Sequence, residues 1–478
     1  MALTSRSIKT IPPVVWIIVI WAAAVLPNLP VRSFIWDEGI NAVIAQDIIE
    51  RGDLLQPSAF GARWCEEPSL LPWCIAAASR LTGGVNEWSA RLPSMLGVLA
   101  TSLLVFCLVR RYSGKGVAFF SSACFLFCPL LLQKLTIAEP DTLITAFSFT
   151  ALVIYWGRGR PGRVAIWRWL ICGLFLSLGA LAKGPQPVAY FALGVGGFIL
   201  AGKKWSDLPG LIFCLSMPAA AVLGWAVMVY RPGDLAIWLG YMRIGNHLAT
   251  GDFLMERIHF IGHLLLELLP ATILVPVLFF RAEPGRANEK RDLIRLLCWY
   301  AGAATVVLFF WTGARPRYAM PAAPAVAVLA GFALDEIRHR SRLLPRLAVG
   351  ILAGLVLYQL ALVWVIMPLY SDRFGSTRAD GQTIDRTVRA FSGFPIFNVD
   401  GQDADELFYV TRPIRRIDLT DAALITPPAI VLIEPRVQAC LEIQRPDLHF
   451  QPLVRLSNGH RLIVMRVDFL RDKDGNPK

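Results

Sequence analysis

Charged side chains that could carry out chemistry are concentrated between residues 32 and 73, a stretch flanked by strongly apolar sequence. It holds seven carboxylates, starting with the pair Asp37-Glu38 and ending with the pair Glu66-Glu67. Charge beside lipid is costly and usually has a function. A carboxylate placed here could act as a general base that takes a proton from an attacking hydroxyl. The stretch therefore predicts a catalytic loop at a membrane face.

Further acids, cations and helix breakers recur at the boundaries of other apolar segments. Lysine and arginine around a polar cavity suit a phosphate group. Singly, each has another explanation: Lys183 could simply end a helix, and Arg315 and Arg317 could extend toward lipid headgroups. Their joint occurrence favours a site for group transfer from a phosphorylated lipid. The motifs are Glu139-Pro140-Asp141, Lys183-Gly184-Pro185, Asn246-His247 and Arg315-Pro316-Arg317-Tyr318.

Cofactor signals in the sequence are sparse. His259 and His263 have the i, i+4 spacing of metal ligands, but no carboxylate accompanies them as in a zinc protease helix. A histidine alone, such as His247, is more often a polar surface residue than a ligand. No glycine-rich phosphate loop is present, which argues against a nucleotide sugar or ATP as substrate. Cys65 and Cys74 could pair in an oxidising compartment or remain two free thiols.

The composition is that of a polytopic membrane protein. The chain has 478 residues, 55% of them hydrophobic and only 17% charged, with a mean hydropathy of +0.53. The net charge of +12 comes from short basic clusters between apolar runs, where cations anchor to headgroups and set orientation. We therefore expect membrane lipids as partners and no nucleic acid.

Apolar segments long enough to cross a bilayer recur along the first 370 residues and predict about eleven spans. The first is expected to be a retained anchor, since no small-residue cleavage site follows it. The excess of Lys and Arg in alternate loops places the charged stretch, and the C-terminal region, on the outside. The segments lie near 12–30, 90–109, 116–133, 142–157, 167–182, 186–202, 208–229, 258–280, 293–312, 318–335 and 345–368.

Two further features complete the expected architecture. Helical periodicity predicts surface helices at 38–50 and 70–81 within the outside loop. From about residue 371 the sequence becomes charged and soluble, with β-rich runs at 394–399, 429–435 and 461–467. The predicted fold is an all-α membrane domain, residues 1–370, followed by a small α/β domain, residues 371–478.

The order of these motifs resembles a known family. Asp37-Glu38 after the first span, Arg63-x-x-Glu66-x-Pro68, and Arg317-Tyr-x-x-Pro321 near the last spans are similar to the polyprenyl-phosphate-sugar glycosyltransferases of the GT-C class. Within that class the chain resembles the lipid A aminoarabinose transferases and the protein O-mannosyltransferases. The resemblance covers about the first 370 residues.

This resemblance implies a sugar donor linked to undecaprenyl phosphate, a cavity open to the periplasm of a bacterial inner membrane, and no nucleotide. Asp37 matches the proposed base, with Glu38 and Asp141 as further candidate acids. Where the family reads Glu-Lys-Pro, this chain reads Glu66-Glu67-Pro68, which leaves Arg63 as a substitute phosphate contact. Glu66 and His247 match positions that can hold a divalent metal. The implied substrate-binding residues are Arg63, Glu139, Lys183, Arg315, Arg317 and Tyr318.

Two other classes of protein fit parts of the pattern. A transporter or flippase for a lipid-linked substrate would place its charges at mid-membrane in broken helices, often in symmetric halves. A sensor or assembly protein would explain the C-terminal domain but not the acidic loop. Neither the sugar nor the acceptor follows from the sequence, since lipid A, another lipid, a glycan or a protein hydroxyl would all suit the same cavity.

Overall fold

The computed structural model describes residues 12–157, 164–236, 238, 253–280, 289–311, 314–338, 340–401, 404–456 and 462–470. They form two compact units. The first comprises Met1–Pro27, Glu66–Leu71 and Pro93–Ile366, and the second comprises Asn28–Cys65, Pro72–Leu92 and Met367–Lys478. The chain leaves the first unit for the last time after Ile366, and most of the stretch between the first two predicted spans belongs to the second unit.

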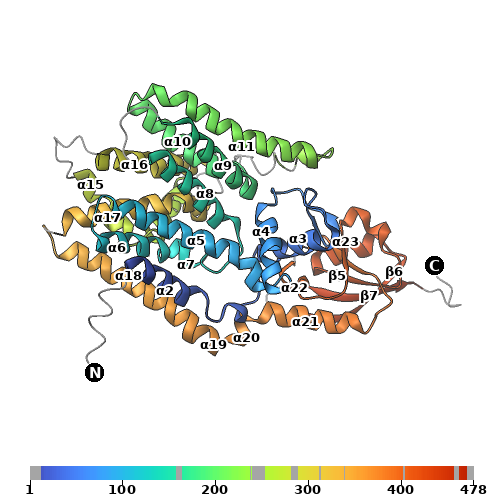
Figure 1. Cartoon of the computed structure of the whole chain (residues 1–478). Helices are drawn as coiled ribbons and strands as arrows, with labels where there is room; N and C mark the ends of the chain where they lie inside the picture. The colour runs from blue at the N-terminus through green and yellow to red at the C-terminus, as the bar shows by residue number, and fades with distance from the viewer. Residues whose placement is uncertain are drawn as a thin grey trace. The chain divides into compact units, whose positions relative to one another are not determined.

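The first unit is helical, which confirms the predicted membrane fold class (Figure 1). Its helices are α2 (Pro13–Val25), α5 (Glu87–Arg110, shared with the second unit), α6 (Lys115–Leu126), α7 (Pro129–Leu132), α8 (Pro140–Trp156), α9 (Ile166–Lys183), α10 (Gln186–Ala201), η2 (Trp205–Asp207), α11 (Leu208–Val229), α13 (Phe253–Glu267), α14 (Ala271–Leu274), α15 (Val277–Phe280), α16 (Glu289–Phe310), η4 (Pro316–Ala322), α17 (Ala323–Ile337), α18 (Leu343–Ala361) and the π-helical turn Leu362–Ile366.

Seven helical segments of the described chain are long and apolar enough to cross a bilayer, and a bent pair, Phe253–Glu267 with Ala271–Phe279, would make an eighth. Three other predicted spans coincide with α6, α8 and α10, which have 12, 17 and 16 residues. A straight crossing needs about 20 residues. The protein is therefore a multi-span membrane protein, and the number eleven stays a prediction.

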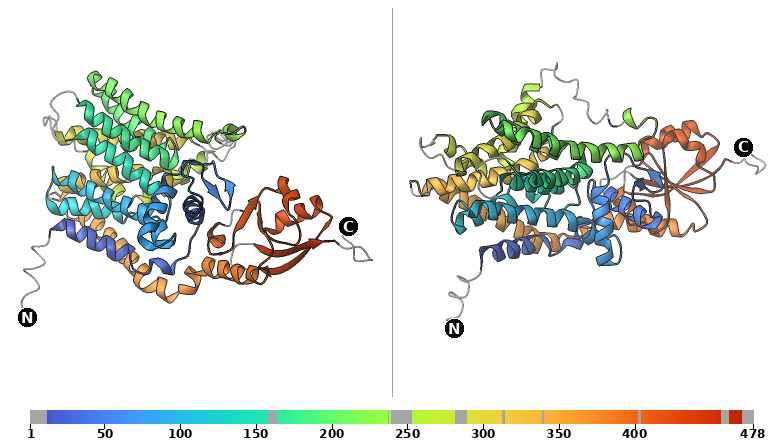
Figure 2. Two further views of the ribbon diagram at one scale, coloured as in Figure 1. Left: turned by 45° about the vertical axis from the view of Figure 1, so that its right-hand side comes forward. Right: turned by 45° about the horizontal axis from the view of Figure 1, so that its top comes forward.

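Helix α17 packs against α6, α14, α16 and α18 in the first unit and is almost wholly buried. Its small residues let neighbouring helices come close, as is usual between membrane helices. A side chain at Gly331 would collide with Ser121 of α6. The helices from α8 to α11 lie side by side in both views of Figure 2, so the loops that join them are gathered at the ends of this layer.

The second unit contains a five-stranded sheet with the strand order β4-β3-β5-β7-β6. The first three strands are parallel, and β7 pairs antiparallel with both β5 and β6. The elements are η1 (Leu29–Val31), α3 (Glu38–Arg51), β1 (Ser58–Ala59), β2 (Ala62–Arg63), α4 (Leu70–Thr82, shared with the first unit), α19 (Met367–Leu369), α20 (Ser371–Phe374), α21 (Ser376–Arg389), β3 (Ile396–Val399), α22 (Ala404–Leu407), β4 (Ile414–Ile417), η6 (Leu419–Leu424), β5 (Ala429–Ile433), α23 (Pro435–Gln444), β6 (Leu448–Arg455) and β7 (Ile463–Phe469).

Strand β5 is buried on both faces, as a run of five apolar residues predicts for a central strand. Val431 packs in one apolar cluster with Leu441 of α23. Ile430, which points the other way, packs with Ile384 of α21. The predicted α/β domain is thus confirmed, with its three predicted β-rich runs on β3, β5 and β7. Strands β4 and β6 were missed, because charged and polar residues interrupt both.

Both helices predicted between the first two spans are present, as α3 and α4. Helix α3 begins in contact with α22. The backbone N–H of Gly39 donates a 2.7 Å hydrogen bond to the Asp405 carboxylate, which supplies the cap that no side chain of α3 itself provides. A Cβ at Gly39 would lie only 2.6 Å from the backbone of Ala404 and Asp405. Position 39 therefore requires glycine.

The pKa of Asp405 is raised to about 8, mainly by burial, with a smaller rise from the nearby carboxylates of Glu38, Glu406 and Asp37 and a lowering by the Gly39 hydrogen bond. In the unfolded chain an aspartate titrates near pH 4. Between these two values the folded state holds a proton that the unfolded state has lost. Rising pH therefore favours unfolding across this window.

We expect Asp405→Asn to gain thermal stability relative to the wild type as the pH rises from 5 to 8, because the amide keeps the acceptor for Gly39 and carries no titrating proton. Melting temperatures of the purified protein at several pH values measure this. Asp447→Asn is the control, since Arg445 lowers the pKa of Asp447 and that carboxylate stays ionised in both states above pH 5. A constant difference between Asp405→Asn and wild type across the range would contradict the prediction.

Candidate functional site

Acids at helix starts and cations at helix ends meet in the first unit. Asp141 lies in the first turn of α8, and Lys183 is the last residue of the neighbouring α9, before Gly184 with φ of +81°. The Lys183 ammonium donates to both Asp141 carboxylate oxygens, at 2.9 and 2.8 Å. Each charge also complements the dipole of its own helix. The pair is therefore placed by secondary structure that the sequence specifies.

A second ion pair adjoins the first. Lys134, in the segment between α7 and α8, bonds the Glu139 carboxylate at 2.5 Å, and both side chains are buried. Arg317 approaches the same Glu139 oxygen at 3.9 Å. The Nε of Arg317 is buried and has no hydrogen-bond partner among the described residues. These five side chains, which we call the cation–acid network, are Lys134, Glu139, Asp141, Lys183 and Arg317.

Tyr318 supports the network. Its backbone carbonyl accepts hydrogen bonds from Gln186 at 2.7 Å and from the Tyr190 hydroxyl at 3.0 Å, which ties η4 to α10. Its ring lies 5.8 Å from the Lys183 ammonium and 5.6 Å from the Arg317 guanidinium. The aromatic face thus contacts two cations. Trp311 stacks on the same ring.

The structure distinguishes residues that the sequence grouped together. Arg317 joins the network, whereas Arg315 is exposed and forms no ion pair with a described residue. Glu66 is half-buried in the first unit, and Arg63 is half-buried at the end of β2 in the second. His247 and Asn246 lie outside the described residues. Among the residues that the structure does describe, no group of three or more His, Cys, Asp or Glu could hold a metal ion. The divalent metal expected at Glu66 and His247 stays a prediction.

Asp37 occupies an exposed position at the start of α3 in the second unit. Its backbone carbonyl accepts a hydrogen bond from the Asn41 side chain at 2.7 Å. The preceding Trp36 has φ of +61° and is 60% exposed. Such a backbone conformation is strained for a bulky residue and is characteristic of functional sites. The carboxylate of Asp37 is therefore on a fixed turn with access to solvent.

Glu38 has a different environment from Asp37. It is fully buried, and Arg91, itself fully buried, grips both its oxygens at 2.8 and 2.9 Å. The Ile35 N–H donates to the same carboxylate at 3.2 Å. The other donors of Arg91 bond three backbone carbonyls of residues 29–33. Glu38 thus holds the loop that precedes α3, and Asp37 is the carboxylate of the pair that is exposed to solvent.

Three residues of these arrangements were missed from the sequence. Lys134 and Arg91 are lone cations inside apolar segments. This pattern indicates a buried ion pair, because a buried cation needs a partner. Asp405 gave no such signal, because it lies in a polar stretch far along the chain from Gly39.

The sequence is similar to those of known proteins. Residues 66–229 match the family described as dolichyl-phosphate-mannose-protein mannosyltransferase. An undecaprenyl phosphate-alpha-4-amino-4-deoxy-L-arabinose arabinosyl transferase of Enterobacter sp. (strain 638) is 26% identical over 307 residues, which cover 61% of this chain and 54% of the relative. The chain therefore spans about half the length of that relative.

Solved structures define the class of fold. The chain is a multi-span membrane protein with the GT-C fold, which confirms the predicted resemblance. In particular, its fold is that of ArnT from Cupriavidus metallidurans: the apo structure gives a TM-score of 0.69 at 17% identity, and the structure bound to undecaprenyl phosphate gives 0.67 at 18%. Each match covers 97% of this chain and 98% of the other.

The buried pair of Glu38 and Arg91 yields a stability prediction. Arg91→Gln leaves a buried carboxylate without its main partner, which typically costs about 3–5 kcal/mol. We expect the double variant Glu38→Gln, Arg91→Gln to be more stable than Arg91→Gln alone, since it removes the uncompensated charge. Thermal unfolding in one detergent measures all three proteins. Equal stability of the single and double variants would show that the pair is not coupled.

Proposed function

We propose that the protein is a membrane glycosyltransferase that moves a sugar from undecaprenyl phosphate to an acceptor hydroxyl. Its relatives are transferases that use undecaprenyl phosphate-linked aminoarabinose, and an ArnT structure with the same fold binds undecaprenyl phosphate. The observation that carries the proposal is the cation–acid network. Among its five side chains three are positive and two negative, and the buried Arg317 Nε lacks a partner among the described residues. A phosphate oxygen would satisfy that group.

The proposed reaction is a single displacement. The acceptor oxygen forms a bond to the anomeric carbon as the bond from that carbon to the phosphate oxygen breaks. Asp37 takes the proton of the acceptor hydroxyl. Undecaprenyl phosphate leaves with the bonding electron pair, and its growing negative charge is stabilised by Lys183 and Arg317. No nucleotide takes part.

Orientation and acceptor complete the proposal. The basic loops between the apolar segments favour a site that faces the periplasm of a bacterial inner membrane, together with the sheet of the second unit. The name of the arabinosyl transferase relatives favours aminoarabinose as the sugar, and lipid A is the acceptor we propose. Glu66 remains our candidate ligand for a divalent metal, which would polarise an oxygen of the substrate.

We expect Asp37→Asn to lower transfer by about 100-fold or more, because the amide keeps the size of the side chain but cannot accept the proton. Transfer of labelled aminoarabinose from undecaprenyl phosphate to lipid A by the reconstituted protein measures this. Asp53→Asn is the matched control, since Asp53 is another exposed aspartate of the same stretch whose carboxylate caps a turn. Retention of more than a tenth of wild-type turnover would remove Asp37 as the base.

Movement of the donor across the bilayer without transfer of the sugar would identify the protein as a flippase instead.

We expect Arg317→Lys to lower turnover at least about tenfold with a smaller effect on donor affinity, because lysine keeps the charge but loses the two-pronged grip on phosphate. The exposed Arg315 should tolerate the same change better. Arg346→Lys, on the exposed face of α18, is the control. Turnover and donor affinity are measured for all three, and wild-type turnover in Arg317→Lys would exclude a phosphate contact through Arg317.

A further inference from the structure

A second site lies in the first unit, at a cavity of about 890 Å³ between α15, α16 and the end of α17. It is lined by residues that the proposed reaction does not use. The cavity begins at the Glu289 end of α16, whereas Arg317 follows the opposite end of that helix. A helix of 22 residues is roughly 33 Å long. The basic end of the cavity, at Lys290, is therefore far from the cation–acid network, and no residue of that network lines the cavity.

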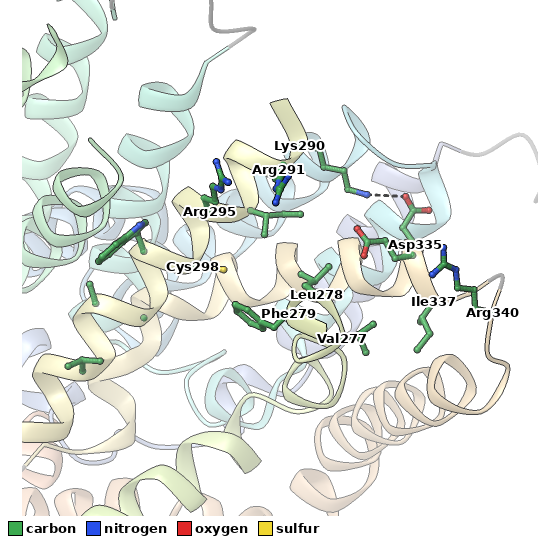
Figure 3. A pocket seen from close by; sticks show the side chains of 16 residues that line it. Val277, Leu278, Phe279, Lys290, Arg291, Arg295, Cys298, Asp335, Ile337 and Arg340 are labelled. Carbon is green, nitrogen blue, oxygen red and sulfur yellow. Dashed lines mark ion pairs between the residues drawn. The ribbon is translucent and has the colours of Figure 1, made fainter. Parts of the chain in front are cut away.

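One end of the cavity is basic. Four cations and two acids line it, namely Lys290, Arg291, Arg295 and Arg340 against Asp335 and Glu336. Lys290 is already paired with Asp335 at 3.6 Å, as Figure 3 shows. Arg295 forms an ion pair at 3.5 Å with the half-buried Asp292, which also pairs with Lys204 at 3.3 Å. Arg291 is half-buried and forms no ion pair with any described residue. Arg291 is thus available to an anion, and Arg295, one helical turn away, is held only by a largely solvent-exposed ion pair, which contributes little.

The rest of the cavity is apolar. Phe279 of α15 is 66% exposed and Val306 of α16 is 57% exposed. Between them α16 presents Gly302, where an added Cβ would meet no atom within 4 Å. Figure 3 shows Leu278 and Phe279 on the other side of the cavity from Arg291. The trough runs along a helix long and apolar enough to span the membrane. A basic end and an apolar trough together suit an amphiphilic ligand.

We propose that this cavity binds one anionic phospholipid, with its phosphate between Arg291 and Arg295 and an acyl chain in the trough beside Gly302. Basic pockets between membrane helices bind anionic headgroups in this way. A zwitterionic headgroup would bring a second positive charge next to the arginines and lose the net attraction. Binding of a lipid in this cavity does not depend on the proposed transfer reaction.

The test is a lipid titration of the purified protein followed by native mass spectrometry. Phosphatidylglycerol and phosphatidylcholine with the same acyl chains are compared, with undecaprenyl phosphate as a third probe. The wild type should retain one phosphatidylglycerol preferentially. The double variant Arg291→Gln, Arg295→Gln should bind it roughly 25-fold more weakly, about fivefold for each cation removed. The control Arg342→Gln, Arg346→Gln removes two exposed arginines that do not line the cavity.

A second variant tests the trough without altering charge. Gly302→Leu should fill the open space and weaken phosphatidylglycerol binding, whereas Gly350→Leu, at an equally open position of α18, should not. The proposal is overturned by equal retention of both phospholipids, by unchanged binding in the Arg291, Arg295 and Gly302 variants, or by tighter binding of undecaprenyl phosphate at this site.

Discussion

The ion pair between Arg91 and Glu38 is the interaction on which the arrangement of the second unit depends. A guanidinium has five N–H donors, and Arg91 places all of them: two on Glu38 and three on the carbonyls of Leu29, Arg32 and Ser33. A charge buried so completely is tolerated only with full pairing. The loop before α3 therefore has one favourable conformation, and the exposed Asp37 is positioned by its buried neighbour.

The same constraint organises the first unit by a different means. Here the charges lie at helix ends, where the peptide dipoles contribute to their stability. Asp141 and Lys183 meet because α8 and α9 are neighbours of opposite direction, and η4 brings Arg317 to Glu139. A site made from helix termini is rigid, because the charged groups move only with whole helices. Such preorganisation suits the stabilisation of charge that appears only during a reaction.

Local patterns in the sequence were sufficient for much of this architecture. Apolar runs, helix breakers and the β-rich runs of the last hundred residues predicted the membrane helices, α3, α4 and three of the five strands. The convergence of Glu139, Asp141, Lys183 and Arg317 followed from placing loops on one side of a membrane. What could not be predicted is long-range pairing: nothing local indicates that Asp405 caps α3 or that Arg91 pairs with Glu38. Charged strands such as β4 also escape, since their burial is set by the sheet around them.

The interleaving of the two units along the chain has a consequence for biosynthesis. Ser33 bonds Phe374 and Gly39 bonds Asp405, contacts separated by 341 and 366 residues. During translation the first loop is made early, yet its partners are made last. It must remain without its native packing while every intervening helix enters the membrane. The high contact order of this unit makes its closure a slow, late step, and the loop is exposed to proteases and chaperones until then.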